Sequence, residues 1–233
     1  MPRQSGFLER AVEIPPSGAA GDLTVPINAR GVVIFAHGSG SSRFSSRNRF
    51  VAEVLQRAGL VTLLLDLLTP EEEQVDLRTR QLRFDIELLA NRLVDATNWV
   101  AGDSEIGKLV MGYFGASTGA AAALIAAAQL PDTTRAVVSR GGRPDLAGAA
   151  LPKVQAPTLL IVGGEDYPVI ELNERAMKEL RSEKRLEIVP GATHLFEEAG
   201  ALEKVAALAR AWFERHFSTR IQTKSANSGS HPA

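Results

Sequence analysis

The sequence predicts an α/β fold in which a doubly wound, mostly parallel sheet of about eight strands carries helices on both faces. Short apolar runs alternate with longer segments of helical period along the chain. Most of these runs are apolar along their whole length, as expected of strands that are covered on both faces. Neither an internal repeat nor a linker-like stretch interrupts residues 1–217. We therefore expect a single domain over these residues.

Two of the predicted strands stand at the start of the chain, at residues 7–14 and 21–26. They are more polar than the later runs, which suits an antiparallel hairpin at one edge of the sheet. The other six runs are rich in β-branched residues or leucine and are bounded by glycine, proline or aspartate. They lie at residues 31–38, 60–66, 108–115, 135–142, 156–164 and 185–191.

The longest predicted helix covers about residues 71–100, where apolar side chains recur at helical spacing from Leu82 to Trp99. One long helix would fill this part of the chain, so no insertion is large enough for a cap domain. Residues 218–233 are small and polar, and we expect them to form a disordered tail. Further helices are predicted at residues 45–59, 118–130, 170–182 and 198–217.

Composition excludes several classes of protein. The 233 residues carry 26 Lys and Arg against 27 Asp and Glu, so no basic excess favours nucleic acid or an anionic membrane. No apolar run approaches the roughly 18 residues of a membrane span, and the N-terminus does not resemble a signal peptide. We therefore expect a cytoplasmic protein. The absence of cysteine excludes disulfides and thiolate ligands, and no residue cluster suggests a metal or another cofactor.

The stretch "VMGYFGASTGAAAA" places Ser117 between a predicted strand and a predicted helix. Gly115 and Gly119 flank it, as a sharp and crowded strand-to-helix turn requires. Such a turn exposes the serine hydroxyl at the helix N-terminus, where the N–H of Thr118 points to the place in which an oxyanion would form. The pattern indicates a nucleophile elbow.

A nucleophilic serine needs a base and an acid that orients the base. Asp166 follows the predicted strand at 156–164, and His194 follows the last one, so all three residues lie at carboxyl ends of strands. The order serine, aspartate, histidine is that of one known class of serine hydrolases. Glu165 and, less well placed, Asp145 are rivals of Asp166 for the role of the acid.

With these residues in place, the sequence resembles the α/β-hydrolase superfamily and, within it, the small, capless dienelactone hydrolase-like branch. The resemblance extends over about residues 5–217 and is carried by "AHGSGSS", "GASTGAAAAL", "GGEDYPV" and "ATHLFEE". It implies hydrolysis of small carboxylic esters through an acyl-enzyme. Dienelactone hydrolases use a cysteine nucleophile where this chain has Ser117, and a glutamate where it reads Phe35–Ala36–His37. Related domains also occur joined to phosphoribosyltransferases.

The resemblance also implies that the turn after the first core strand supplies the second donor of an oxyanion hole. In this chain that donor would be the N–H of Gly38 or Ser39. We expect His37 to shape the turn rather than to exchange protons.

The loop "SRGGRPD" at residues 139–145 predicts an anion-binding group near the site. It carries Arg140 and Arg143 around two glycines at the same edge of the sheet. A guanidinium binds carboxylate or phosphate through two hydrogen bonds, so an anionic ester substrate is expected. Arg143 is nearer the apex of the turn and is the preferred candidate, unless it pairs with Asp145 or faces water.

Two other functions remain open at this stage. Gly38 and Gly40 follow a strand, and a second strand ends at Asp66, which is the arrangement of an NAD(P)-binding Rossmann oxidoreductase. Arg43 occupies the position of the third glycine of that motif, which disfavours it. The chain could also be a non-catalytic binding domain that has kept the hydrolase scaffold. The sequence predicts neither the natural substrate nor the oligomeric state.

Overall fold

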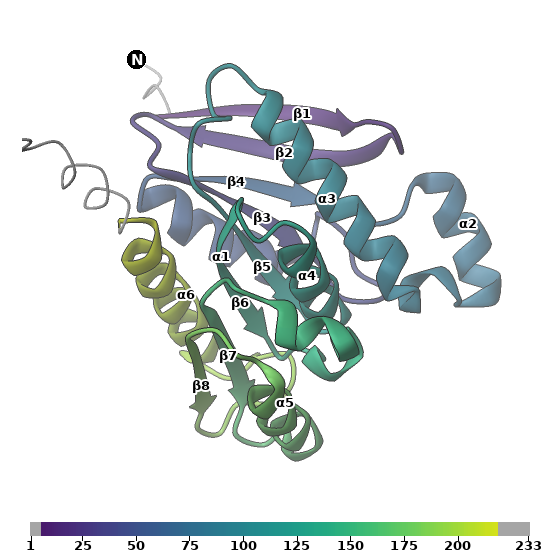
Figure 1. The fold of residues 1–233 in the computed structure, drawn as a ribbon, viewed down its shortest axis with the longest axis vertical. Helices are drawn as coiled ribbons and strands as arrows, with labels where there is room; N and C mark the ends of the chain where they lie inside the picture. Colours follow the sequence, from purple (N-terminus) through teal and green to yellow (C-terminus); the bar gives the residue numbers. More distant parts are fainter. Residues whose placement is uncertain (1–5, 219–233) are drawn as a thin grey trace, which may run out of the picture.

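The computed structural model describes residues 6–218, which form an eight-stranded sheet covered by helices (Figure 1). The order of the strands is β1-β2-β4-β3-β5-β6-β7-β8. β1 and β2 are antiparallel and occupy one edge, while all neighbours from β4 to β8 are parallel. The predicted sheet and its edge hairpin are confirmed. The strands are β1 (Phe7–Ile14), β2 (Ala19–Pro26), β3 (Gly31–Ala36), β4 (Leu60–Leu65), β5 (Met111–Ala116), β6 (Thr134–Arg140), β7 (Thr158–Gly163) and β8 (Lys184–Val189).

The central strands are buried on both faces because each face carries its own apolar cluster. Val33 and Phe35 of β3 belong to the cluster under α1 (Ser46–Arg57) and α6 (Ala201–Phe217). Their neighbours Val32 and Ile34 point to the opposite cluster. That second cluster lies under α3 (Ile86–Gly102), α4 (Thr118–Gln129) and α5 (Tyr167–Glu179). Uniformly apolar runs therefore encode strands with two covered faces.

The single long helix predicted over residues 71–100 is wrong, since the structure divides this segment. α2 (Pro70–Thr79) begins with a capping box between Thr69 and Glu72 and ends at Arg80, whose φ is 55°. A short 3₁₀ turn, η1 (Leu82–Phe84), follows before Asp85 caps α3. The apolar period that predicted the helix starts only at Leu82, and the preceding residues are polar except for Val75 and Leu77. In Figure 1, α2 stands out from the body of the molecule beside α3.

A second irregular segment, η2 (Pro144–Lys153), joins β6 to β7 and bends at Gly148. The sequence did not predict it. No cap domain is inserted anywhere in residues 6–218, as expected. Apart from Ser218, the predicted tail at 218–233 lies outside the described residues. No helix within 6–218 is long and apolar enough to cross a membrane.

Candidate active site

Ser117 occupies the sharp turn between β5 and α4. Its backbone has φ 50° and ψ −121°. This conformation is strained for any residue other than glycine. A Cβ on Gly115 would lie 2.4 Å from the Cα of Ala120, and one on Gly119 would lie 2.4 Å from the carbonyl oxygen of Ala36. Both flanking glycines are therefore required for the close approach of neighbouring backbone. The local structure is that of a nucleophile elbow.

His194 and Asp166 form a hydrogen-bonded pair at the same edge of the sheet. The Nδ1 of His194 lies 2.6 Å from Oδ2 of Asp166. Asp166 stands directly before α5 and is largely buried, whereas the side chain of His194 is 40% exposed. With Nδ1–H donated to the carboxylate, Nε2 of His194 is left to accept a proton.

A cavity of about 230 Å³, which we call the serine pocket, brings the elbow and the histidine together. It is lined by Ser117 and His194, by the turn at Gly38 and Ser39, and by Arg140. α1 also contributes Arg47 and Asn48 to the pocket, and the sequence did not predict either of them. The signal that could have found them is the polar start of a helix that otherwise packs on the sheet.

The two rival acids have other partners. Glu165 accepts a hydrogen bond from the hydroxyl of Tyr167 at 2.8 Å. Asp145 accepts two hydrogen bonds from the guanidinium of Arg143. Of the three candidates, the structure brings Asp166 to His194.

The turn after β3 lies directly against the elbow. A Cβ on Gly38 would lie 3.0 Å from the Cβ of Ser117 and 3.3 Å from the carbonyl oxygen of Ala116, so a side chain there would crowd the elbow. The N–H of Ser39 donates to Oγ1 of Thr118 at 2.9 Å. Thr118 is the first residue of α4, where a backbone N–H has no acceptor within its own helix. The N-terminus of α4 therefore faces the serine pocket with an orphan donor and a positive dipole end.

His37 is held between two backbone groups beside this turn. Its Nδ1 lies 2.9 Å from the carbonyl oxygen of Gly38, and its Nε2 accepts the N–H of Leu67 at 3.0 Å. Burial lowers the pKa of His37 below its ordinary value, although the carbonyl of Gly38 and nearby carboxylates oppose the shift. In the neutral ring both nitrogens make hydrogen bonds to backbone groups, so His37 is suited to hold the turn in place.

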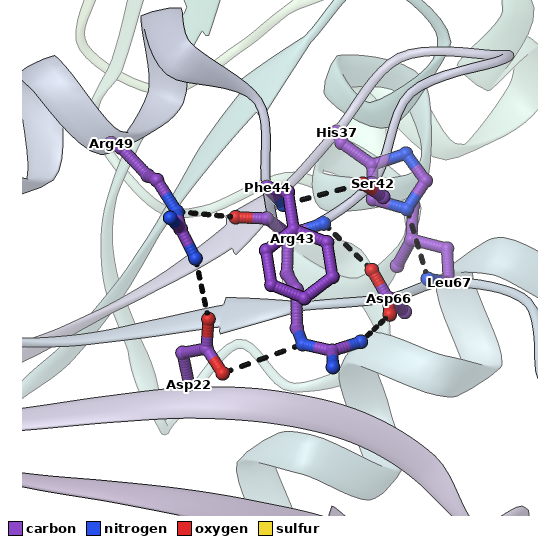
Figure 2. A network of polar contacts seen from close by, with 8 residues as sticks. All are labelled: Asp22, His37, Ser42, Arg43, Phe44, Arg49, Asp66 and Leu67. Carbon is purple, nitrogen blue, oxygen red and sulfur yellow. Dashed lines mark hydrogen bonds and ion pairs between the residues drawn. The ribbon is translucent and has the colours of Figure 1, made fainter.

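A network of polar contacts anchors the other end of the turn (Figure 2). The N–H of Arg43 donates to Oδ1 of Asp66 at 2.6 Å, and its guanidinium pairs with Oδ2 of the same carboxylate. The Arg43 guanidinium also lies 3.3 Å from Asp22, which pairs with Arg49. Phe44 packs its ring against both guanidinium groups. Asp66 is thus used to anchor this turn, which disfavours the ribose-binding role considered for it.

Arg140, at the end of β6, lines the serine pocket. It is buried, and its contacts include a 3.4 Å hydrogen bond to Asn48 and the ring of Phe196. Within residues 6–218, no carboxylate lies within 4.0 Å of its guanidinium. Burial, with a smaller contribution from nearby Arg47, lowers the pKa of Arg140 to about 10. Arg47 itself pairs with Glu197.

The geometry does not support the preference for Arg143. Its guanidinium donates to both carboxylate oxygens of Asp145, at 2.9 and 2.8 Å. It is also absent from the lining of the serine pocket. Its backbone N–H donates to the carbonyl oxygen of Ser117 at 3.0 Å, so Arg143 contacts the elbow through its backbone while its side chain pairs with Asp145. The structure brings Arg140 to the site in its place.

Comparisons with known proteins concern the family and the fold of the chain. A family model described as the dienelactone hydrolase family matches residues 20–219. A dienelactone hydrolase from Anabaena variabilis, known from its crystal structure, is 61% identical to this chain in sequence. The two structures match with a TM-score of 0.88 over 91% of this chain and 99% of that chain. Est1E from Butyrivibrio proteoclasticus, at 15% identity, has a TM-score of 0.72 over 88% and 98% of the two chains.

A curated relative from Mycobacterium tuberculosis carries the name "Putative phosphoribosyl transferase". It is 62% identical over 201 residues, which make up 86% of this chain and 44% of that protein. The chain therefore spans less than half of the relative's length.

Proposed function

The chain belongs to the dienelactone hydrolase family, and from this premise we propose that it is a serine esterase that cleaves small carboxylic esters. The observation that carries the proposal is the geometry of the elbow. Ser117 and His194 line one cavity, and Asp166 lies 2.6 Å from the imidazole on its far side. A nucleophile, a base and a group that orients the base are the parts that acyl transfer to water requires.

The reaction begins when Oγ of Ser117 attacks the ester carbonyl carbon and Nε2 of His194 accepts the hydroxyl proton. Asp166 holds the imidazole in this tautomer and stabilises the imidazolium. Collapse of the tetrahedral intermediate breaks the ester C–O bond, and His194 returns the proton to the leaving alcohol. Water then attacks the carbonyl carbon of the acyl group while His194 accepts a proton from it. The bond from this carbon to Oγ of Ser117 breaks, His194 returns the proton to Oγ, and the carboxylic acid leaves.

The negative charge that develops on the carbonyl oxygen needs donors at the elbow. The N–H of Thr118 at the start of α4 is the first candidate. The second belongs to the turn at Gly38 and Ser39. Because the N–H of Ser39 already donates to Oγ1 of Thr118, we assign the second donation to Gly38. Loss of one such donor typically costs about 2.7–4 kcal/mol of transition-state stabilisation.

The substrate is proposed to carry a carboxylate or phosphate beside the ester. A buried charge without an opposite partner is costly, and Arg140 is such a charge at the edge of the serine pocket. An anion on the substrate would provide the missing partner. The modest volume of the pocket favours short acyl groups, so rates should fall from acetyl and butyryl esters to palmitoyl esters.

The chemistry is tested with the Ser117→Ala variant. The unaltered protein should hydrolyse p-nitrophenyl acetate and become labelled by a fluorophosphonate probe, and the variant should do neither. Full activity of Ser117→Ala would exclude this mechanism. Absence of both activities from the unaltered protein would favour a non-catalytic binding domain, and binding of NAD in a titration would favour the oxidoreductase.

The anionic substrate is tested with two matched arginine variants. Arg140→Gln should reduce kcat/KM for a monomethyl ester of succinate roughly 10- to 150-fold more than for methyl butyrate, the effect of one hydrogen-bonded ion pair of about 1.5–3 kcal/mol. Arg143→Gln is the control, because this arginine pairs with Asp145 outside the pocket. Equal losses on the charged and neutral esters would show that Arg140 is structural.

A further inference from the structure

A second cavity lies on the other side of the turn that approaches Ser117. It measures about 180 Å³, and we call it the leucine pocket after Leu67, Leu68, Leu77 and Leu89 in its lining. These leucines come from three places: the loop after β4, α2 and α3. Gly38, Ser39 and Ser41 line both this cavity and the serine pocket, so the turn forms a wall that the two share.

Apart from the exposed Glu73, the charged side chains that line the leucine pocket pair with each other. Asp76 of α2 is buried and pairs with Arg83 of η1. Burial alone would raise the pKa of Asp76, but hydrogen bonds from the amide and guanidinium of Arg83 outweigh it and lower the pKa. His37 also lines the pocket as a neutral ring. This cavity therefore lacks the buried, unpaired cation that Arg140 places in the serine pocket.

Size and exposure indicate what would fill the leucine pocket. An engineered cavity of about 150 Å³ lined by apolar side chains is known to bind benzene in another protein. Leu77 lies at the mouth of the pocket, where 65% of it is exposed. A ring or a branched alkyl group that entered the pocket would cover this leucine and remove its surface from water.

We propose that the leucine pocket binds an apolar ring or branched alkyl group of the substrate, while Arg140 binds the anionic end on the opposite side of the turn. This inference rests on the proposed function for the identity of the ligand. It deepens that function by predicting a substrate with two unlike ends, one charged and one apolar, on either side of the scissile ester. α2, which the sequence did not separate from α3, supplies the outer wall of the apolar side.

Binding is tested without catalysis, on ¹⁵N-labelled Ser117→Ala protein titrated with benzyl alcohol. The alcohol should shift the amide resonances of Gly40, Leu68 and Leu77. Adding Leu77→Trp or Leu77→Asp should weaken its binding at least tenfold. Val75→Trp is the matched control, because Val75 is also exposed on α2 but does not line the pocket. Shifts confined to another part of the protein, or equal binding by the Leu77 variants, would overturn the proposal.

Catalysis gives an independent measurement, the ratio of kcat/KM for benzyl acetate to that for methyl acetate. Both Leu77 variants should lower this ratio at least fivefold, and Val75→Trp should leave it unchanged. If neither ester is hydrolysed while benzyl alcohol still binds at Leu77, the proposed esterase function fails and the pocket stands. If both esters are hydrolysed but the ratio and the binding do not respond to Leu77, the pocket fails and the esterase stands.

Discussion

The turn at residues 37–45 separates two groups of polar side chains that differ in how far the protein satisfies them. On one side, the Arg43 guanidinium pairs with two carboxylates, Asp66 accepts from the backbone and side chain of Arg43, and His37 bonds backbone groups through both ring nitrogens. On the other side, Arg140 is buried more deeply than Arg43, yet within residues 6–218 no carboxylate lies within 4.0 Å of its guanidinium. The satisfied groups fix the backbone, and the unsatisfied one has capacity left for a ligand.

The largest expected effect contrasts the two histidines. His194→Ala should lower kcat/KM for p-nitrophenyl acetate roughly 10⁴-fold or more while the melting temperature changes little, because His194 is partly exposed and acts on the reacting serine. His37→Ala should instead lower the melting temperature. It leaves the N–H of Leu67 and the carbonyl of Gly38 without this partner, at about 1–3 kcal/mol for each buried group left unsatisfied.

The two measurements together decide between the roles. If a folded His37→Ala protein were as inactive as His194→Ala, the contrast between the two histidines would fail. If His194→Ala kept its activity, the Ser117–His194–Asp166 assignment would be wrong.

The next effect contrasts the two arginines in stability. Arg43→Gln leaves Asp66 without its cation and Asp22 with Arg49 alone, and should lower the free energy of unfolding by about 1–3 kcal/mol. Arg140→Gln removes a buried charge that has no opposite partner, so the free energy of unfolding should stay the same or rise. Urea unfolding of both variants beside the unaltered protein measures this. A loss in Arg140→Gln as large as that in Arg43→Gln would place Arg140 in the scaffold.

The sequence predicts best what depends on local pattern. The strands are predictable because runs such as residues 31–36 and 159–163 are apolar throughout rather than alternating with polar residues. The elbow is predictable because Gly115 and Gly119 flank Ser117 where neighbouring backbone comes too close for a side chain. Residues at the carboxyl ends of parallel strands share one edge of the sheet, so the sequence predicts that Asp166 and His194 lie near each other. The structure has them 2.6 Å apart.

The sequence does not predict the direction of a side chain within a loop. Arg140 and Arg143 are three residues apart, and only the structure shows that one meets Asp145 while the other lies in the serine pocket. The split between α2 and α3 was missed for a related reason. It depends on the left-handed backbone of Arg80 and on the pairing of Asp76 with Arg83, which helical periodicity does not encode.

The smallest expected effect is a pH dependence of stability that comes from the satisfied side of the turn. Burial lowers the pKa of His37 in the folded protein, so the unfolded chain binds its proton more readily. Stability from this group is therefore fully present above the ordinary histidine pKa, about 6.5, and falls as the pH drops from there towards the lower pKa of the folded state. The pKa of His216 is also lowered, again mainly by burial. The contribution of His37 must therefore be isolated with a variant.

His37→Gln is that variant, because an amide can donate to the carbonyl of Gly38 and accept from the N–H of Leu67 without titrating. The free energy of unfolding, measured in urea at pH 7.5 and at pH 5, should fall less on acidification in His37→Gln than in the unaltered protein. His216→Gln, on α6, is the matched control and should leave the contribution of His37 intact. An identical fall in His37→Gln and in the unaltered protein would mean that His37 does not titrate in this range. Its two backbone contacts would then hold the turn at every pH tested, and the contrast with Arg140 would rest on ion pairing alone.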